Sequence, residues 1–211
     1  KTGLVEFLQP YADDGAIIVS SGGTAKTLRD GGIEVIEVSD YTGFPEVMGG
    51  RVKTLNPKVH MGLLYRPDNE EDLDLLTKHE VYPFDLVVAN LYPFAAAQDK
   101  GVKGDELIEY IDIGGPSLLR AAAKNYQNIC VVNDPRDYQW IQQKEKLTLD
   151  DRKFLAAKVF QKTSSYDQMI SNHFYDELEG SEERPKPFHL RTDLVITLRY
   201  GENPQQKARW Y

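Results

Sequence analysis

AIIVSSGGTA, at residues 16–25, joins a short apolar run to a glycine turn and then to a helix-forming segment. An apolar run bounded by turn residues predicts a short buried strand, here at residues 16–19. The same pattern predicts further strands at residues 34–38, 86–89 and 128–132. Helical periodicity between them predicts helices at residues 4–11, 24–31, 70–79, 105–110 and 116–125, the last with Pro116 at its first position.

Strands that alternate with helices are typical of an α/β fold with a mostly parallel sheet and helices on both faces. Downstream, residues 148–178 carry apolar side chains at helical spacing and predict one long or broken amphipathic helix, capped by Thr148. Residues 179–187 are rich in charge and hold two prolines, which is typical of a linker before a strand-like run at residues 193–198. We therefore expect an α/β domain with a helical extension at residues 1–180, and a linker with the start of a further domain at residues 181–211.

The composition, with 41% apolar residues and a formal net charge of -8 over 211 residues, is that of a folded, soluble protein. A net acidic chain disfavours sequence-independent binding of nucleic acid, which depends on many Lys and Arg residues at phosphates. The single cysteine, Cys130, precludes an intrachain disulfide and favours a reducing, cytoplasmic setting. No apolar run approaches the roughly 20 residues that span a bilayer, so we expect no membrane partner. The histidines lack metal-like spacing, and we predict no metal site.

Two glycine-containing loops are candidate anion sites. The first is the turn 20–25, which follows a predicted strand, opens a helix and offers free N–H groups beside Ser and Thr hydroxyls. It is neither a Walker loop nor a dinucleotide fingerprint, and a structural turn is an equal alternative. The second is the loop 49–60, whose Arg51, Lys53 and Lys58 form a cationic cluster suited to a phosphate or a developing oxyanion. A solvated basic loop is its alternative.

The third candidate is the segment 111–125, in which Asp112 lies between two isoleucines and before a Gly-Gly pair. Partial desolvation makes such a carboxylate a candidate general base. Arg120 and Lys124 follow four residues apart on a predicted helix, where like charges repel unless an anion is near or the helix dipole favours them. A straight helix separates the ends of residues 116–124 by about 12 Å, so Asp112 and Lys124 share a site only if the loop folds back or the ligand is long.

The fourth candidate is the pair Asn90 and Tyr92, which follows the predicted strand at residues 86–89. Ligands of open parallel sheets bind at the carboxyl ends of the strands, where these residues offer an amide and a phenol. Packing at a strand end is the alternative explanation.

Several of these motifs together resemble one family. They are KTGL at residues 1–4, SGGTA at 21–25, TGFPE at 42–46, RVKT at 51–54, and the segments 90–94, 112–124 and 198–204. In this order, over nearly the whole chain, they resemble the bifunctional AICAR transformylase/IMP cyclohydrolase family. The resemblance implies a methylglyoxal-synthase-like α/β domain, dimeric in the family, that converts formyl-AICAR to IMP with loss of water.

The resemblance also implies roles for individual residues. The 5′-phosphate would be held by Lys1, Ser21, Gly22, Gly23, Thr24, Arg51, Lys53 and Thr54. The base and ribose would contact Ala89, Asn90, Asp112, Ile113 and Gly114. The catalytic group would be Lys53, Tyr92, Asp112 and Lys124. In that group Asp112 would act as the base, Lys53 would stabilise the developing oxygen charge, and Tyr92 and Lys124 would move protons.

Ring closure would then need no metal or organic cofactor, and its partners would be a purine ribonucleotide and a second copy of the chain. The family's transformylase part, which uses 10-formyltetrahydrofolate, needs several hundred further residues, so we expect no formyl transfer here. The chain departs from the family at Asn56 and Gln205, where the family usually has His, and the family's serine upstream of residue 1 has no counterpart. Two other functions stay open: a regulatory nucleotide-binding module and a methylglyoxal synthase that acts on a triose phosphate.

Overall fold

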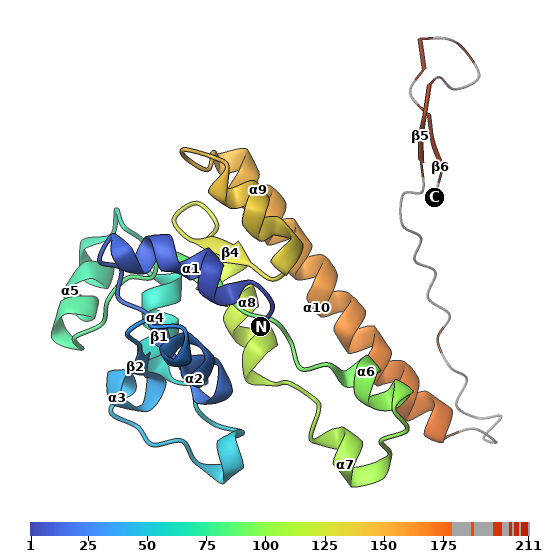
Figure 1. Ribbon diagram of the computed structural model, residues 1–211, viewed down its shortest axis with the longest axis horizontal. Helices are drawn as coiled ribbons and strands as arrows, with labels where there is room; N and C mark the ends of the chain where they lie inside the picture. Colours follow the sequence, from blue (N-terminus) through green and yellow to red (C-terminus); the bar gives the residue numbers. More distant parts are fainter. Residues whose placement is uncertain (179–186, 188–195, 200–202, 204, 207, 211) are drawn as a thin grey trace. The chain divides into compact units, whose positions relative to one another are not determined.

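The computed structural model describes residues 1–178, 187, 196–199, 203, 205–206 and 208–210. The chain divides into two compact units, Lys1–Ile170 and Ser171–Tyr211. In the first unit helices alternate with short parallel strands, which confirms the predicted α/β class (Figure 1).

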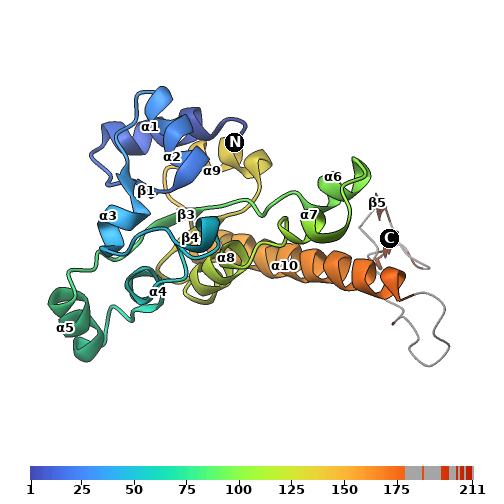
Figure 2. The same cartoon turned by 90° about the horizontal axis from the view of Figure 1, so that it is seen from below.

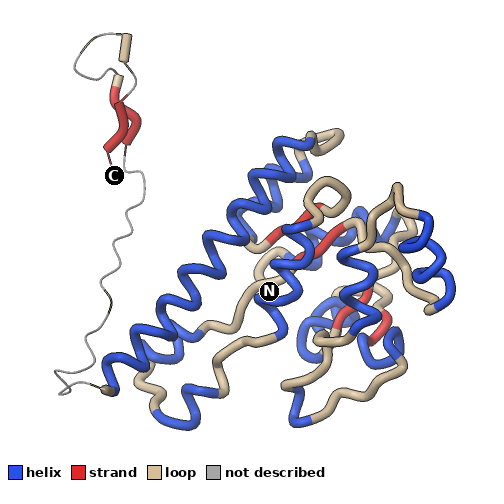
Figure 3. Tube along the Cα trace, turned by 180° about the vertical axis from the view of Figure 1, so that it is seen from behind, coloured by secondary structure: helices blue, strands red, loops and turns tan. Residues whose placement is uncertain are grey.

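The strands of the first unit form two separate parallel pairs. Strand β1 (Val19–Ser20) pairs with β2 (Ile36–Glu37), and β3 (Leu86–Val88) pairs with β4 (Cys130–Val132). Among the described residues no ladder joins β1 to β3, so the predicted sheet is present as two half-sheets. Figure 3 shows how little of the chain these strands occupy.

Each strand is shorter than the apolar run that predicted it. The predicted strand at residues 34–38 ends at Glu37, because Val38 already begins helix α3 (Val38–Thr42). The predicted strand at residues 16–19 is regular only from Val19, and the side chain of Ile17 is 60% exposed. Because no backbone hydrogen bonds join the two half-sheets in the described part of the chain, the apolar runs have no neighbouring strand that would extend their regular pairing.

Helices before β3 include two that the sequence did not predict, α3 and α4 (Pro57–Leu64). Besides α3, these helices are α1 (Leu4–Asp13), α2 (Gly22–Asp30), α4 and α5 (Glu70–Lys78), with a 3-10 turn η1 (Met48–Gly50). In the longer of the two, α4, Pro57 occupies the first turn, and the Asn56 side chain accepts the Lys58 N–H at 2.8 Å. The predicted loop at residues 49–60 therefore ends at Asn56, and Lys58 instead stacks on Tyr41.

The second half of the unit holds α6 (Phe94–Asp99), α7 (Gly104–Ile108), α8 (Gly114–Lys124), η2 (Pro135–Asp137) and α9 (Tyr138–Gln142). Helix α8 begins two residues earlier than predicted, so Pro116 is its third residue and not its first. This start follows from Asp112, whose carboxylate accepts the Gly115 N–H at 2.7 Å and so satisfies a backbone donor in the first turn.

Two apolar clusters cover the opposite faces of the half-sheets. On one face, α4, α8 and the first half of α10 (Leu149–Glu177) bury Leu63, Leu119 and Val159 against β3 and β4. On the other face, α1, α2 and α9 bury Phe7 and Leu28. Each fully buried apolar side chain of this size stabilises the fold by about 1.5–3 kcal/mol, so these layers hold the half-sheets in place.

The long helix predicted at residues 148–178 is confirmed as α10, and the Thr148 hydroxyl accepts the Asp151 N–H at 3.2 Å, as expected for its cap. The predicted linker at residues 179–187 lies outside the described residues except for Pro187, as does most of the family motif at 198–204. The strand predicted at residues 193–198 is described from Ile196, where β5 (Ile196–Leu198) pairs antiparallel with β6 (Ala208–Trp210). Within the described part of the chain, no helix has the length and apolar character needed to cross a membrane.

Candidate nucleotide site

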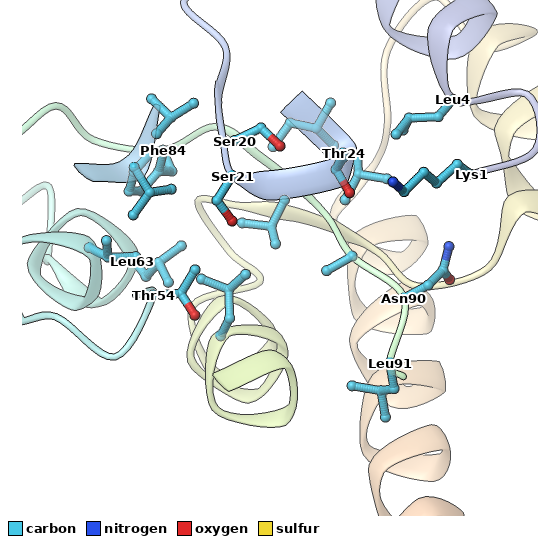
Figure 4. Close-up of a pocket in the computed structure, with 18 of the residues that line it drawn as sticks. Lys1, Leu4, Ser20, Ser21, Thr24, Thr54, Leu63, Phe84, Asn90 and Leu91 are labelled. Atoms are coloured by element: carbon cyan, nitrogen blue, oxygen red, sulfur yellow. The ribbon is translucent and has the colours of Figure 1, made fainter. Parts of the chain in front are cut away.

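A pocket of about 470 Å³ opens between β1 and β3, at the carboxyl ends of both strands. This volume lies within the range of small-molecule sites. Figure 4 shows Lys1 pointing toward Thr24, whereas Thr54 and Asn90 line other sides of the pocket from separate segments. The polar lining residues are Lys1, Ser20, Ser21, Thr24, Thr54, Asn90, Tyr92 and Tyr138.

Cations and free N–H groups meet at the start of α2. The N–H groups of Gly22 and Gly23 have no acceptor among the described residues, because both lie in the first turn of the helix. A Cβ at Gly23 would lie 2.7 Å from Lys1 Nζ, and one at Gly22 would lie 3.6 Å from Lys53 Nζ. Two ammonium groups beside the positive end of a helix dipole repel each other and the dipole, and an anion bound there relieves this repulsion.

The local sequence explains this geometry. Val19 is packed into the core, Ser21 is extended as the residue before the helix, and Gly22 has φ 54°, a conformation that residues with a Cβ rarely adopt. The strand thus turns sharply into α2, and the free N–H groups of Gly22 and Gly23 lie between the pocket residues Ser21 and Thr24.

The two cations of the following loop have acidic partners that the sequence analysis did not identify. Lys53 Nζ lies 3.7 Å from Glu46 Oε1. Arg51 forms an exposed ion pair with Glu109, and the hydrogen bond from Nε to Oε2 is 3.2 Å long. This hydrogen bond raises the pKa of the Arg51 guanidinium above its ordinary value. Arg51 therefore lies outside the pocket lining, paired with a carboxylate.

Asp112 adjoins the other end of the pocket. Besides the Gly115 N–H, its carboxylate accepts the N–H of the lining residue Tyr92 at 3.4 Å. The side chain is half-buried, whereas the neighbouring Ile113 is 60% exposed, so the expected apolar surroundings are present on one side only. The Thr54 hydroxyl lies 2.7 Å from the position that a Cβ would take at Gly114, which connects this end to the cationic loop.

The predicted base and ribose contacts surround the same opening. Ala89 and Asn90 line the pocket directly after β3, and the Ala89 N–H continues the ladder by donating to the Val132 carbonyl at 3.1 Å. Tyr92 is half-exposed at the rim. The ends of β1 and β3 therefore bring together the turn 21–24, the loop 53–54 and the segment 89–92.

Lys124 does not join this group. It is the last residue of α8, an uninterrupted helix of 11 residues, and thus lies about 15 Å along the axis from Gly114. Its side chain is exposed and has no hydrogen bond or ion pair with the described residues. Arg120, four residues earlier, stacks on Phe160 of α10 with its guanidinium carbon 5.4 Å from the ring centre. The segment does not fold back as a site shared by Asp112 and Lys124 requires.

One further residue at the site escaped the sequence analysis. The Tyr166 hydroxyl, on α10, accepts the Asp112 N–H at 2.8 Å. Tyr166 continues the buried stripe of Leu155, Val159 and Thr163, and a buried tyrosine within such a stripe needs a polar partner for its hydroxyl. The helical spacing of these residues is the feature of the sequence that indicates a buried Tyr166 with a polar partner.

The remaining reactive groups do not contribute to the site. Burial raises the pKa of the Cys130 thiol to about 11, and this side chain packs against the apolar cluster that contains Phe7 and Leu28. Among the described residues there is no group of three or more His, Cys, Asp and Glu side chains that could hold a metal ion.

Two family models match the chain. One, described as an MGS-like domain, matches residues 3–117 and confirms the methylglyoxal-synthase-like fold expected from the sequence motifs. The other, described as the AICARFT/IMPCHase bienzyme, matches residues 122–211. Together the two models cover nearly all of the chain.

Similar individual proteins point to the same family as the family models. The chain is 46% identical to the bifunctional purine biosynthesis protein PurH of Persephonella marina and 44% identical to that of Bacillus subtilis, over 100% of its own length. It spans about 42% of the length of these relatives. The crystal structure of ForH superimposes with a TM-score of 0.73 and 31% identity, over 86% of this chain and 95% of ForH.

Proposed function

Because the chain belongs to the AICARFT/IMPCHase bienzyme family of purine biosynthesis, we propose that it is an IMP cyclohydrolase, which closes the ring of formyl-AICAR to give IMP. The observation that carries the proposal is the placement of the ammonium groups of Lys1 and Lys53 at the free N–H groups of α2. A phosphate is the group that this arrangement suits, and Asp112 adjoins the same pocket through its hydrogen bond with the lining residue Tyr92.

The reaction joins two groups of one molecule. The carboxamide nitrogen attacks the formyl carbon, and the new C–N bond leaves a negative charge on the former formyl oxygen. The attacking nitrogen loses one proton, and the oxygen departs as water once it is protonated. As the C–O bond breaks, the formamido nitrogen loses its proton and forms the C=N bond of the ring. The amide nitrogen is a poor nucleophile, so catalysis must align the two groups, accept a proton and stabilise the oxygen charge.

The residues around the pocket divide these tasks. The α2 turn and Lys1 bind the 5′-phosphate, and this fixes the position of the ring at the other end of the pocket. Asp112 accepts the proton from the attacking nitrogen. By resemblance Lys53 also stabilises oxygen charge, although the structure places its Nζ beside Gly22, at the phosphate end. Tyr92 at the rim returns a proton to the departing oxygen. Lys124 completes the catalytic group by resemblance, although the structure places it at the opposite end of α8.

Cofactors and partners follow from the same proposal. Ring closure is an internal condensation without an oxidant or reductant, so we expect neither a metal nor an organic cofactor. A purine ribonucleotide is the proposed ligand, and the homodimer, the cytoplasmic location and the absence of nucleic-acid and membrane partners stay predictions. Formyl transfer is not proposed for these residues.

The direct test is to incubate the purified chain with formyl-AICAR and follow IMP by its absorbance, with a reaction without protein as the reference. We expect IMP to form in proportion to protein concentration and equally well after treatment with EDTA. Dihydroxyacetone phosphate serves as the control substrate. IMP binding in calorimetry without ring closure would point to a regulatory module, and methylglyoxal from the control would point to methylglyoxal synthase.

A further inference from the structure

The phenol of Tyr166 binds the two backbone peptide groups on either side of Ile111, the residue before Asp112. Its hydroxyl accepts the Asp112 N–H at 2.8 Å and donates to the Tyr110 carbonyl at 2.8 Å. The Asp112 carboxylate is held separately, by the Gly115 N–H at 2.7 Å and the Tyr92 N–H at 3.4 Å. Backbone and side chain of this one residue are therefore both fixed.

Tyr166 is itself immobilised by packing. Only 3% of the residue is exposed, and it packs in an apolar cluster with Phe94 of α6 and Leu107 of α7. Figures 1 and 2 both show α6 and α7 beside α10. Burial is the main cause that raises the pKa of the Tyr166 phenol, so the hydroxyl keeps its proton at neutral pH and can donate to Tyr110.

The helix that supplies this phenol lies outside the MGS-like match. That match ends at residue 117, whereas Tyr166 falls within residues 122–211, which match the AICARFT/IMPCHase bienzyme. The contact thus links the part of the chain that carries Asp112 to the part that is specific to the bienzyme family.

We propose that Tyr166 is a positioning residue for ring closure, and this inference rests on the proposed function. The phenol sets the path of residues 110–112, and this path directs the Asp112 carboxylate against Gly115, where any Cβ would overlap the carboxylate. Without the hydroxyl, the Asp112 N–H and the Tyr110 carbonyl lose their shared partner, and the segment rotates. A displacement of about 1 Å at a reacting group can lower a rate about 100-fold.

The test compares Tyr166→Phe with a matched control, Tyr41→Phe. Tyr41 is 7% exposed, and its hydroxyl accepts the Tyr82 N–H at 3.2 Å and donates to the Tyr82 carbonyl at 3.5 Å, away from the pocket lining. Each variant loses one buried hydroxyl with the same two kinds of hydrogen bond and keeps its ring. The measurements are kcat and KM for formyl-AICAR from pH 5 to 9, the thermal midpoint, and hydrogen exchange of the Asp112 amide.

We expect Tyr166→Phe to lower kcat about tenfold or more, with KM unchanged, and to narrow the pH range of activity. In Tyr166→Phe the Asp112 amide hydrogen should exchange with solvent faster than in the unaltered chain. The thermal midpoint of unfolding should fall no further than in Tyr41→Phe. The control keeps the kcat and the pH profile of the unaltered chain.

Other results separate the two proposals. If the unaltered chain forms IMP and Tyr166→Phe keeps its kcat, or if both variants lose kcat equally, the positioning role is wrong and ring closure stands. If the unaltered chain forms no IMP, the proposed function is wrong, and the positioning role, which rests on it, is overturned with it.

Discussion

At one end of the pocket, Gly22 and Gly23 present N–H groups beside the ammonium groups of Lys1 and Lys53. At the other end, backbone donors hold the Asp112 carboxylate, and a phenol from a distant helix accepts the backbone N–H of the same residue. The first arrangement binds charge that is already present in the ligand. The second meets charge that develops only during the reaction, so it must be placed more accurately.

The two ends also differ in how the chain builds them. The phosphate end arises largely from a strand, a glycine turn and a helix that are contiguous in sequence. The ring-closing end needs the segment after β3, the start of α8 and a side chain from α10 to meet in space. Substitutions at the first end should therefore weaken binding, and substitutions at the second should slow turnover.

The largest effect is expected at the ring-closing end, from Asp112→Asn. The amide oxygen can still accept the Gly115 N–H, so α8 should keep its start, but the group can no longer take a proton. A general base contributes about 100- to 10,000-fold, and we expect kcat to fall by that range. IMP affinity from calorimetry should be unchanged. A large loss of affinity with kcat retained would reverse the assignment of the two ends.

Lys124 provides the next test, because resemblance puts it in the catalytic group and the structure puts it at the far end of α8. We expect Lys124→Ala to lower kcat more than tenfold, in line with a role in proton transfer. Arg120→Ala is the matched control, a cation removed from the same helix four residues earlier. Equal kcat values in the two variants would exclude Lys124 from the catalytic group, which would then consist of Asp112, Lys53 and Tyr92.

The difference between the two ends explains what the sequence could predict. The turn 20–25 was identifiable because its strand, glycines and hydroxyls lie within a few residues of one another, and a helix start binds anions by itself. Helix α10 was identifiable for the same reason: its apolar spacing and its Thr148 cap are local.

Features that depend on contacts between distant segments were not predicted. The pairing of Arg51 with Glu109 joins residues 58 positions apart, and the bond from Asp112 to Tyr166 joins residues 54 apart. The spacing of apolar residues along the sequence does not indicate contacts between such distant residues. The strand lengths are not predictable for the same reason. A ladder of backbone hydrogen bonds ends where the paired strand ends, and the tertiary fold decides which strand pairs with β1. Helix α4 was missed because Pro57 was interpreted as part of a loop, although proline is favoured in a first turn.

A third prediction concerns the phosphate end. Lys53→Ala removes an ammonium group beside Gly22, and hydrogen bonds to charged groups contribute about 1.5–3 kcal/mol, or roughly ten- to 100-fold in affinity. IMP should bind more weakly by about that factor, whereas inosine, which lacks the phosphate, should bind the variant and the unaltered chain equally. Calorimetry with both ligands measures the difference. An equal loss for inosine would place Lys53 at the base and not at the phosphate.

The smallest effect is expected from Glu109→Gln, at the ion pair that holds Arg51 outside the pocket. Both side chains are more than half exposed, so the pair is screened by solvent and a phosphate can compete for the guanidinium. Without the carboxylate, Arg51 is free to turn toward the ligand. IMP should bind about two- to fivefold more tightly at low salt, and the gain should shrink as salt is added. Weaker binding would instead mean that Glu109 orients Arg51 for the phosphate, and the ion pair would then belong to the binding end.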